Sequence, residues 1–190
     1  MTKTNGSKQK WIEKGYEYFA LYGPDNLNIK QISKNIGLSR TTFYHYFGDL
    51  EIYTDELLDL HWEICVQTAI IGSKKCKNFF PDIFDDMEQY PITLKFHKQL
   101  FLNRHILIFN YLFVKINNLH ANTFILKLFS EHFQLNQTKE NIINLWTIVG
   151  ESWYSKLDVN DLSAKKMQLI AEDILESVMK FASSNNYYNK

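Results

Sequence analysis

The sequence predicts an all-α protein of about nine helices. Apolar residues recur three and four positions apart along most of the chain, as in Ile29, Ile32 and Ile36. Another such set runs from Leu94 to Leu112, and no alternation typical of strands persists. Only three prolines and seven glycines interrupt the 190 residues. Long helices with few breaks are the fold that this pattern favours.

Composition indicates a folded chain with a basic front part. Hydrophobic residues make up 45% of the sequence and aromatic residues 15%, which is enough for a core. Residues 1–50 carry seven Lys or Arg and four acidic residues, whereas the remainder carries 14 and 17. A basic segment on an acidic remainder suits contact with an anion.

The spacing of the cysteines and the length of the apolar runs indicate where in the cell the protein is expected. Cys65 and Cys76 lack a CxxC spacing and indicate two free thiols. No apolar run reaches the length of a membrane span, and the first ten residues lack the apolar region of a secretory signal. We expect a cytoplasmic protein with no membrane partner.

Cap residues place the helix boundaries in the first third of the chain. Asn28, Ser39 and Asp49 are expected N-caps, since their side chains accept hydrogen bonds from first-turn amides. Gly37 should end the short helix that Asn28 begins. The helix capped by Asp49 is expected over about 49–64.

The segment GLSRTTFYHYFGDLEIY, residues 37–53, contains most of the candidate functional side chains in the first third of the chain. Phe43 and Phe47 are four residues apart on a helix and should be buried together. The opposite face presents Arg40, Thr41, Tyr44 and His45, flanked by Thr42 and Tyr46. Arginine, threonine, tyrosine and histidine can bond base edges and phosphates in a major groove. Together with the preceding short helix and glycine turn, this indicates a helix-turn-helix.

Residues 8–60 resemble the N-terminal domain of the TetR family of bacterial repressors. The resemblance lies in Phe19 and Gly23 at the end of the first helix, in IKQISKNIGLS, and in SRTTFYHYF before a capped helix. It implies that Arg40, Thr41 and Tyr44 face bases. The remaining DNA-binding residues that we derive from it are Asn28, Lys30, Ser39, Thr42, His45 and Tyr46.

Two positions depart from the family pattern. Leu50 stands where the family usually has a lysine beside the fourth helix, so one phosphate contact is missing or is replaced by backbone amides. Ile36 replaces a small residue before the turn glycine. Lys3, Lys8 and Lys10 are expected in a solvated tail, with phosphate contact as the alternative.

The resemblance also implies how the chain is divided. We expect a three-helix DNA-binding domain over residues 1–50 and a larger helical regulatory and dimerisation domain over 51–190. Two long helices, 138–157 and 161–181, should pair with those of a second copy in a four-helix bundle. Such a homodimer would set two recognition helices about 34–36 Å apart on a near-palindromic double-stranded operator.

An aromatic segment, residues 96–115, is the candidate site for a small amphipathic effector. Rings and polar groups of this kind can line an apolar cavity in which an arginine meets a carboxylate. The candidates are Trp62, Phe96, His97, Phe101, Arg104, His105, Phe109, Tyr111 and Trp146. The alternative is a packed core with the arginine and histidines at the surface. The spacing of His97 and His105, without a nearby carboxylate or thiol, predicts no metal site.

Three functional hypotheses follow. The first is a dimeric sequence-specific transcriptional regulator, a repressor released when an effector tilts the helix at 49–64. The second is a ligand-independent DNA-binding or protein-partnered nucleoid factor. The third is an enzyme. The sequence contains no GxSxG, GxxxxGK, HExxH or GxGxxG motif, which disfavours this hypothesis. We therefore predict no catalytic residue and no cofactor.

Overall fold

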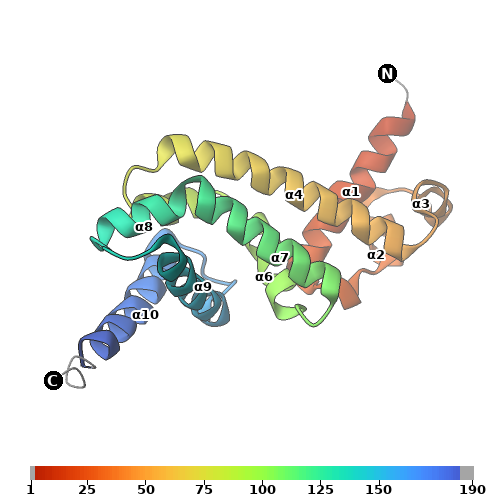
Figure 1. The fold of residues 1–190 in the computed structure, drawn as a ribbon. Coiled ribbons are helices and arrows are strands. Elements are labelled where there is room, and N and C mark those ends of the chain that lie inside the picture. The colour runs from red at the N-terminus through yellow and green to blue at the C-terminus, as the bar shows by residue number, and fades with distance from the viewer. Residues whose placement is uncertain (1–2, 185–190) are drawn as a thin grey trace. The chain divides into compact units, whose positions relative to one another are not determined.

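The computed structural model describes residues 3–184, which contain helices and no strand (Figure 1). The α-helices are α1 (Lys3–Tyr22), α2 (Ile29–Ile36), α3 (Arg40–Phe47), α4 (Leu50–Lys75), α5 (Asp82–Met87), α6 (Pro91–Leu102), α7 (Leu107–His120), α8 (Leu126–His132), α9 (Lys139–Lys156) and α10 (Ala164–Ser184). A π-helical stretch over Ala121–Ile125 lies between α7 and α8 in the chain. The all-α prediction of a helix-turn-helix followed by a larger helical part is confirmed.

The chain forms two compact units, which do not follow the chain order. The first contains α1 to α3, α4 up to Thr68, and residues 92–118 of α6 and α7. The second contains residues 69–91 and everything from Leu119 onward. The boundary expected between residues 50 and 51 concerns the division of functions, and it stays a proposal. No helix in the described residues is long and apolar enough to cross a membrane.

The predicted caps in the first third are confirmed. Asn28 Oδ1 accepts from Gln31 N at 3.1 Å, and Ser39 Oγ accepts from Thr42 N at 3.3 Å. Asp49 Oδ1 accepts from the amide of Ile52 at 2.9 Å. Gly37 takes a left-handed conformation, with φ 68°, which glycine adopts without steric cost. Short-range rules therefore account for where α2, α3 and α4 begin.

Two expectations from the sequence are wrong, one about the end of a helix and one about Lys8. The fourth helix does not end near residue 64 but continues to Lys75, passing through Gly72. The missing Cβ of Gly72 leaves room for the ring of Phe124, so that glycine serves packing rather than a turn. The prediction that Lys8 lies in a solvated tail is also wrong. Lys8 lies in α1 and pairs with Glu56 of α4 at 2.6 Å.

Tight packing of α1 against α4 holds the first unit. Tyr53 is fully buried, and its hydroxyl donates to the backbone oxygen of Trp11 at 2.5 Å. The hydroxyl passes directly over Gly15, where a Cβ would overlap it. Trp11 in turn packs edge-on to Phe43 of α3, with ring centroids 5.2 Å apart. Gly15 is thus required by a close approach of side chain to backbone.

The second unit has its own aromatic core. Phe79 packs against Phe129 and Trp146, with ring centroids 5.3 and 6.1 Å away. Trp153 of α9 donates its indole N–H to the backbone oxygen of Met167 in α10 at 2.9 Å. Both residues are buried, so the bond fixes the pairing of the last two helices.

Two glycine substitutions should act in opposite directions. Gly15→Ala should destabilise the protein by about 1–3 kcal/mol, because the methyl group displaces the Tyr53 hydroxyl. Gly150→Ala, in α9, meets nothing within 4 Å and should stabilise by about 0.5–1 kcal/mol through helix propensity. Urea unfolding followed by circular dichroism measures both. A stabilised Gly15→Ala variant would contradict the packing described.

Candidate nucleic-acid interface

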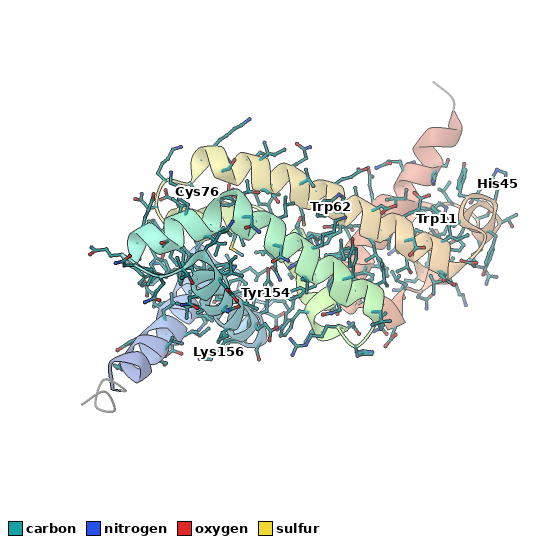
Figure 2. All side chains as sticks on the ribbon, in the orientation of Figure 1. Trp11, His45, Trp62, Cys76, Tyr154 and Lys156 are labelled. Atoms are coloured by element: carbon teal, nitrogen blue, oxygen red, sulfur yellow. The ribbon has the colours of Figure 1, made fainter. Side chains whose placement is uncertain are left out.

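The outer face of α3 is built from polar and aromatic side chains. Arg40, Thr41, Tyr44 and His45 are exposed, and Thr42 and Tyr46 are half-buried. Tyr44 keeps 57% of its surface exposed although its ring packs edge-on against Phe43. Figure 2 shows His45 on the outer side of α3. The predicted recognition face is therefore open to solvent in this unit.

The inner face of α3 anchors it. Phe43 is 1% and Phe47 2% exposed, as predicted from their spacing. Both rings pack on Tyr53 of α4, with centroids 5.0 and 4.7 Å away. Burying two phenylalanines contributes roughly 1.5–3 kcal/mol each, which fixes the rotation of the helix about its axis. That rotation decides which side chains point outward.

Helix α2 is tied to both neighbours. Ser33 donates its hydroxyl to the backbone oxygen of Leu38 at 2.6 Å, across the turn that leads to α3. Asn35 donates its side-chain amide to the Tyr18 hydroxyl of α1 at 2.6 Å. Asn28 and Lys30, predicted to meet phosphates, lie exposed at the start of α2. The helix-turn-helix is thus braced by side-chain bonds as well as by its core.

The start of α4 bears on the missing family lysine. Leu50 is exposed there and carries no charge for a phosphate. The amide of Ile52 is already bonded to the carboxylate of Asp49. A negative cap at this helix terminus opposes a phosphate. This amide therefore does not substitute for the lysine.

The cations of α1 are partly neutralised within the unit. Lys8 pairs with Glu56, and its Nζ also lies 5.6 Å from the centre of the Phe47 ring. Lys14 pairs with Glu17, and that hydrogen bond raises the pKa of the lysine. Lys10 and Lys30 remain exposed. Specific contacts, more than a strong positive field, must carry any interaction of this surface with an anion.

Comparison with known proteins agrees with this geometry. The family model for "Bacterial regulatory proteins, tetR family" matches residues 12–51. These residues include the second half of α1, all of α2 and α3, and the start of α4. No curated protein matches the chain.

The chain carries the helix-turn-helix domain of the TetR family. The resemblance noted from residues 8–60 is confirmed, and the domain supports a DNA-binding transcriptional regulator. The match ends where α4 begins, so it concerns the DNA-binding part of the TetR-family architecture. The helices beyond it are interpreted from their own contacts.

Half of the ligand candidates in the first unit are core residues. Phe96 is fully buried and stacks on Phe19 at 4.1 Å. His97, Phe101 and Phe109 are 4–8% exposed. Phe96 and Phe109 pack on Phe19 of α1, whereas His97 and Phe101 pack on Phe113 of α7.

The other candidates are placed elsewhere. Arg104 and His105 are exposed in the turn between α6, which ends at Leu102, and α7, and Tyr111 is exposed on α7. Asn103 ends α6 by bonding its side-chain amide to the backbone oxygen of Gln99 at 2.9 Å, which breaks the periodic set expected as one helix. Trp62 is half-buried with Lys115 Nζ 3.8 Å from its ring centre. Trp146 belongs to the second unit.

Sequence reasoning missed two buried polar residues, His61 and Lys98. His61 of α4 is fully buried, with Nε2 3.1 Å from His97 Nδ1. It occupies the helical stripe between Leu57 and Cys65, which are both buried. A histidine at a core position of an apolar stripe was the available signal. Within residues 3–184, no group of three or more His, Cys, Asp or Glu could hold a metal ion.

Proposed function

We propose that the protein is a dimeric, sequence-specific transcriptional repressor that a small-molecule effector releases from its operator. The observation that carries the proposal is the exposed polar face of α3, on a helix fixed by Phe43 and Phe47 in a TetR-family domain. This face combines side chains that read bases with side chains that hold phosphates.

Arg40, Thr41 and Tyr44 are the base-reading residues in this proposal. They share the exposed side of the first turns of α3, the part of a recognition helix that enters the major groove. Arg40 can donate two bonds to a guanine, and the Thr41 methyl group suits a thymine. The edge-on contact of Tyr44 with Phe43 limits where its ring can point.

Phosphate contacts flank the reading residues. Thr42, His45 and Tyr46 lie on α3, and Asn28 and Lys30 open α2. Ser39 holds the amide of Thr42, which orients the first turn. With few formal charges in this set, affinity should fall less steeply with salt than for strongly basic domains.

Dimerisation through α9 and α10 is the second part of the proposal. Ile148 of α9 is 63% and Leu169 of α10 is 49% exposed, whereas Val149, Trp153 and Met167 are buried. Large apolar side chains exposed on two paired helices favour burial against a second copy. The predicted segments 138–157 and 161–181 agree closely with α9 and α10, although the side chains of Met179 and Phe181 lie outside those described.

Release by an effector is the third part. Phe96 of α6 packs on α1 and α4, and Phe109 of α7 packs on α1, so a ligand that separates these helices would move the DNA-binding helices. The ligand must bind the released state more tightly for this to occur. The alternative is a DNA-binding factor without an effector, for which the tight packing of Phe96 and His97 is the specific support.

Selection of binding sites from random duplex DNA tests the proposal. Full-length protein at fixed salt should enrich a near-palindrome with half-sites about one helical turn apart. Enrichment of a single half-site would contradict the dimer but keep the reading role of α3. Absence of enrichment, for protein with a cooperative unfolding transition, would overturn sequence-specific regulation and favour the nucleoid alternative if DNA is still bound.

Arg40→Ala and Tyr46→Phe should affect DNA binding differently. Arg40→Ala should cost about 1–3 kcal/mol on the selected site and relax preference at one base pair. Tyr46→Phe removes a proposed phosphate contact and should weaken binding to all sequences alike. Fluorescence anisotropy on the selected duplex and on single-base variants measures both. An equal loss on every sequence for Arg40→Ala would contradict its base-reading role.

Ile148→Glu should separate the dimer. A carboxylate on the exposed face of α9 would be buried without a partner if two copies meet there. Sedimentation velocity should show a shift toward monomer, and operator affinity should fall at least tenfold. The matched control is Ile52→Glu, at a residue 50% exposed on α4, which should leave the oligomeric state unchanged. A dimeric Ile148→Glu variant would place the interface elsewhere.

A further inference from the structure

A chain of hydrogen bonds, buried except at its part-buried Asn117 end, crosses the first unit. The Tyr16 hydroxyl of α1 lies 2.8 Å from His61 Nδ1 of α4. His61 Nε2 lies 3.1 Å from His97 Nδ1 of α6, and His97 Nε2 lies 3.4 Å from Asn117 Oδ1 of α7. Four helices are therefore joined by one continuous polar path. We call these four side chains the Tyr16–Asn117 relay.

Donor and acceptor capacities give the relay a direction. An amide oxygen only accepts, so His97 must carry its proton on Nε2 and accept at Nδ1. His61 then donates from Nε2 and accepts at Nδ1, which leaves Tyr16 as the donor there. Burial raises the pKa of Tyr16 well above its ordinary value, so its hydroxyl keeps the proton that it donates. Every link in this direction is satisfied with neutral side chains.

Aromatic stacking holds the rings of the relay in place. Phe96 stacks on both Tyr16 and His61, with centroids 4.5 and 4.3 Å away. His97 stacks on Phe113 at 4.9 Å. Cys65 Sγ lies 3.7 Å from His61 Nε2, and burial raises the pKa of that thiol to about 12, so this neighbour is uncharged. A ring that turned would leave buried donors or acceptors unpaired, which costs free energy.

The relay also reaches the DNA-binding face. Tyr16 lies five residues beyond Trp11 on α1, and Trp11 packs against Phe43 of α3. Moving α1 relative to α4 would therefore move the base of the recognition helix. The relay is the polar part of the packing that fixes α1 against α4, α6 and α7.

We propose that His61 is a positioning residue for DNA binding, which holds α1 in the pose from which α3 meets DNA and makes that pose depend on His97 and Asn117. The inference rests on the proposed function, because it concerns the same DNA-binding face. A domain whose pose is not fixed must be ordered on binding, which lowers affinity without changing any DNA contact.

Tyr16→Phe tests the first link. It removes one hydroxyl and should weaken binding to the selected operator roughly two- to tenfold, the usual effect of one buried hydrogen bond. The salt dependence should stay that of the wild type, because no phosphate contact is lost. Binding and salt slope both unchanged would overturn the positioning role. A reduced salt slope would overturn it as well, by indicating a direct contact.

The link to α6 is tested by two substitutions at His97. His97→Leu removes the acceptor for His61 and should weaken operator binding to a similar degree. His97→Asn sets an amide oxygen near the position of Nδ1 and should restore binding at least in part. If both variants bind alike at equal stability, His97 acts through packing alone and the relay has no role.

A double-mutant cycle separates the relay from general loosening of α1. Tyr16→Phe and His97→Leu interrupt one path, so their combined loss in affinity should be smaller than the product of the single losses. Tyr18→Phe is the matched control, since Tyr18 is also buried in α1 but bonds Asn35 of α2. The combined loss in affinity of Tyr18→Phe and His97→Leu should equal the product of their single losses. Independent effects of Tyr16 and His97 would overturn the proposal.

Operator binding by the wild-type protein distinguishes a failure of the proposed function from a failure of the positioning role of His61. A wild type that binds no selected duplex overturns the proposed function, and the positioning role falls with it. A wild type that binds its operator, with a Tyr16→Phe variant of equal affinity, overturns the positioning role alone. Imidazole nitrogen chemical shifts should in addition show His61 protonated on Nε2, and protonation on Nδ1 would overturn the relay's direction.

Discussion

The burial of Phe43 against Trp11 and Tyr53 is the contact on which the DNA-binding part depends. Three rings from three helices meet there, with centroid distances of 5.0 and 5.2 Å to Phe43. The ring cluster sets the rotation of α3, and Gly15 leaves the space in which the Tyr53 hydroxyl reaches the backbone of α1. A polar recognition face is useful only on a helix whose other side cannot turn. The packing of Phe43 is therefore a precondition for any polar contact that the exposed face of α3 makes.

Local rules predicted this part of the molecule well. Asn28, Ser39 and Asp49 cap their helices because a short polar side chain next to a first turn has few better partners than its amides. The spacing of Phe43 and Phe47 likewise identified the buried stripe from sequence alone. Each of these features is decided within four residues, the distance over which helical geometry is fixed.

Features that depend on distant residues were not predictable in the same way. His61 and His97 are 36 positions apart, and nothing near either residue indicates the other. A glycine such as Gly72 often marks the end of a helix in a sequence. Here the helix continues, and the ring of Phe124, 52 positions later in the chain, occupies the space beside the glycine where a Cβ would lie. The exposed positions of Arg104 and His105 follow from a turn begun by Asn103, which interrupts an otherwise periodic run. Tertiary packing decided the first two cases over local preference, whereas the third rests on a local turn.

The aromatic residues of α6 therefore deserve a different interpretation from the one that their composition favours. A ring-rich segment with histidine and arginine looks like the lining of a ligand cavity, but Phe96 instead fills the space between Tyr16 and His61. An effector acting here would need to displace a stacked ring or to shift α7 behind His97. Either movement stretches the hydrogen bonds between α1, α4 and α6 before it reaches α3. If the proposed effector acts in this unit, the buried pair of His61 and His97 is therefore the contact through which its movement would reach the DNA-binding helices.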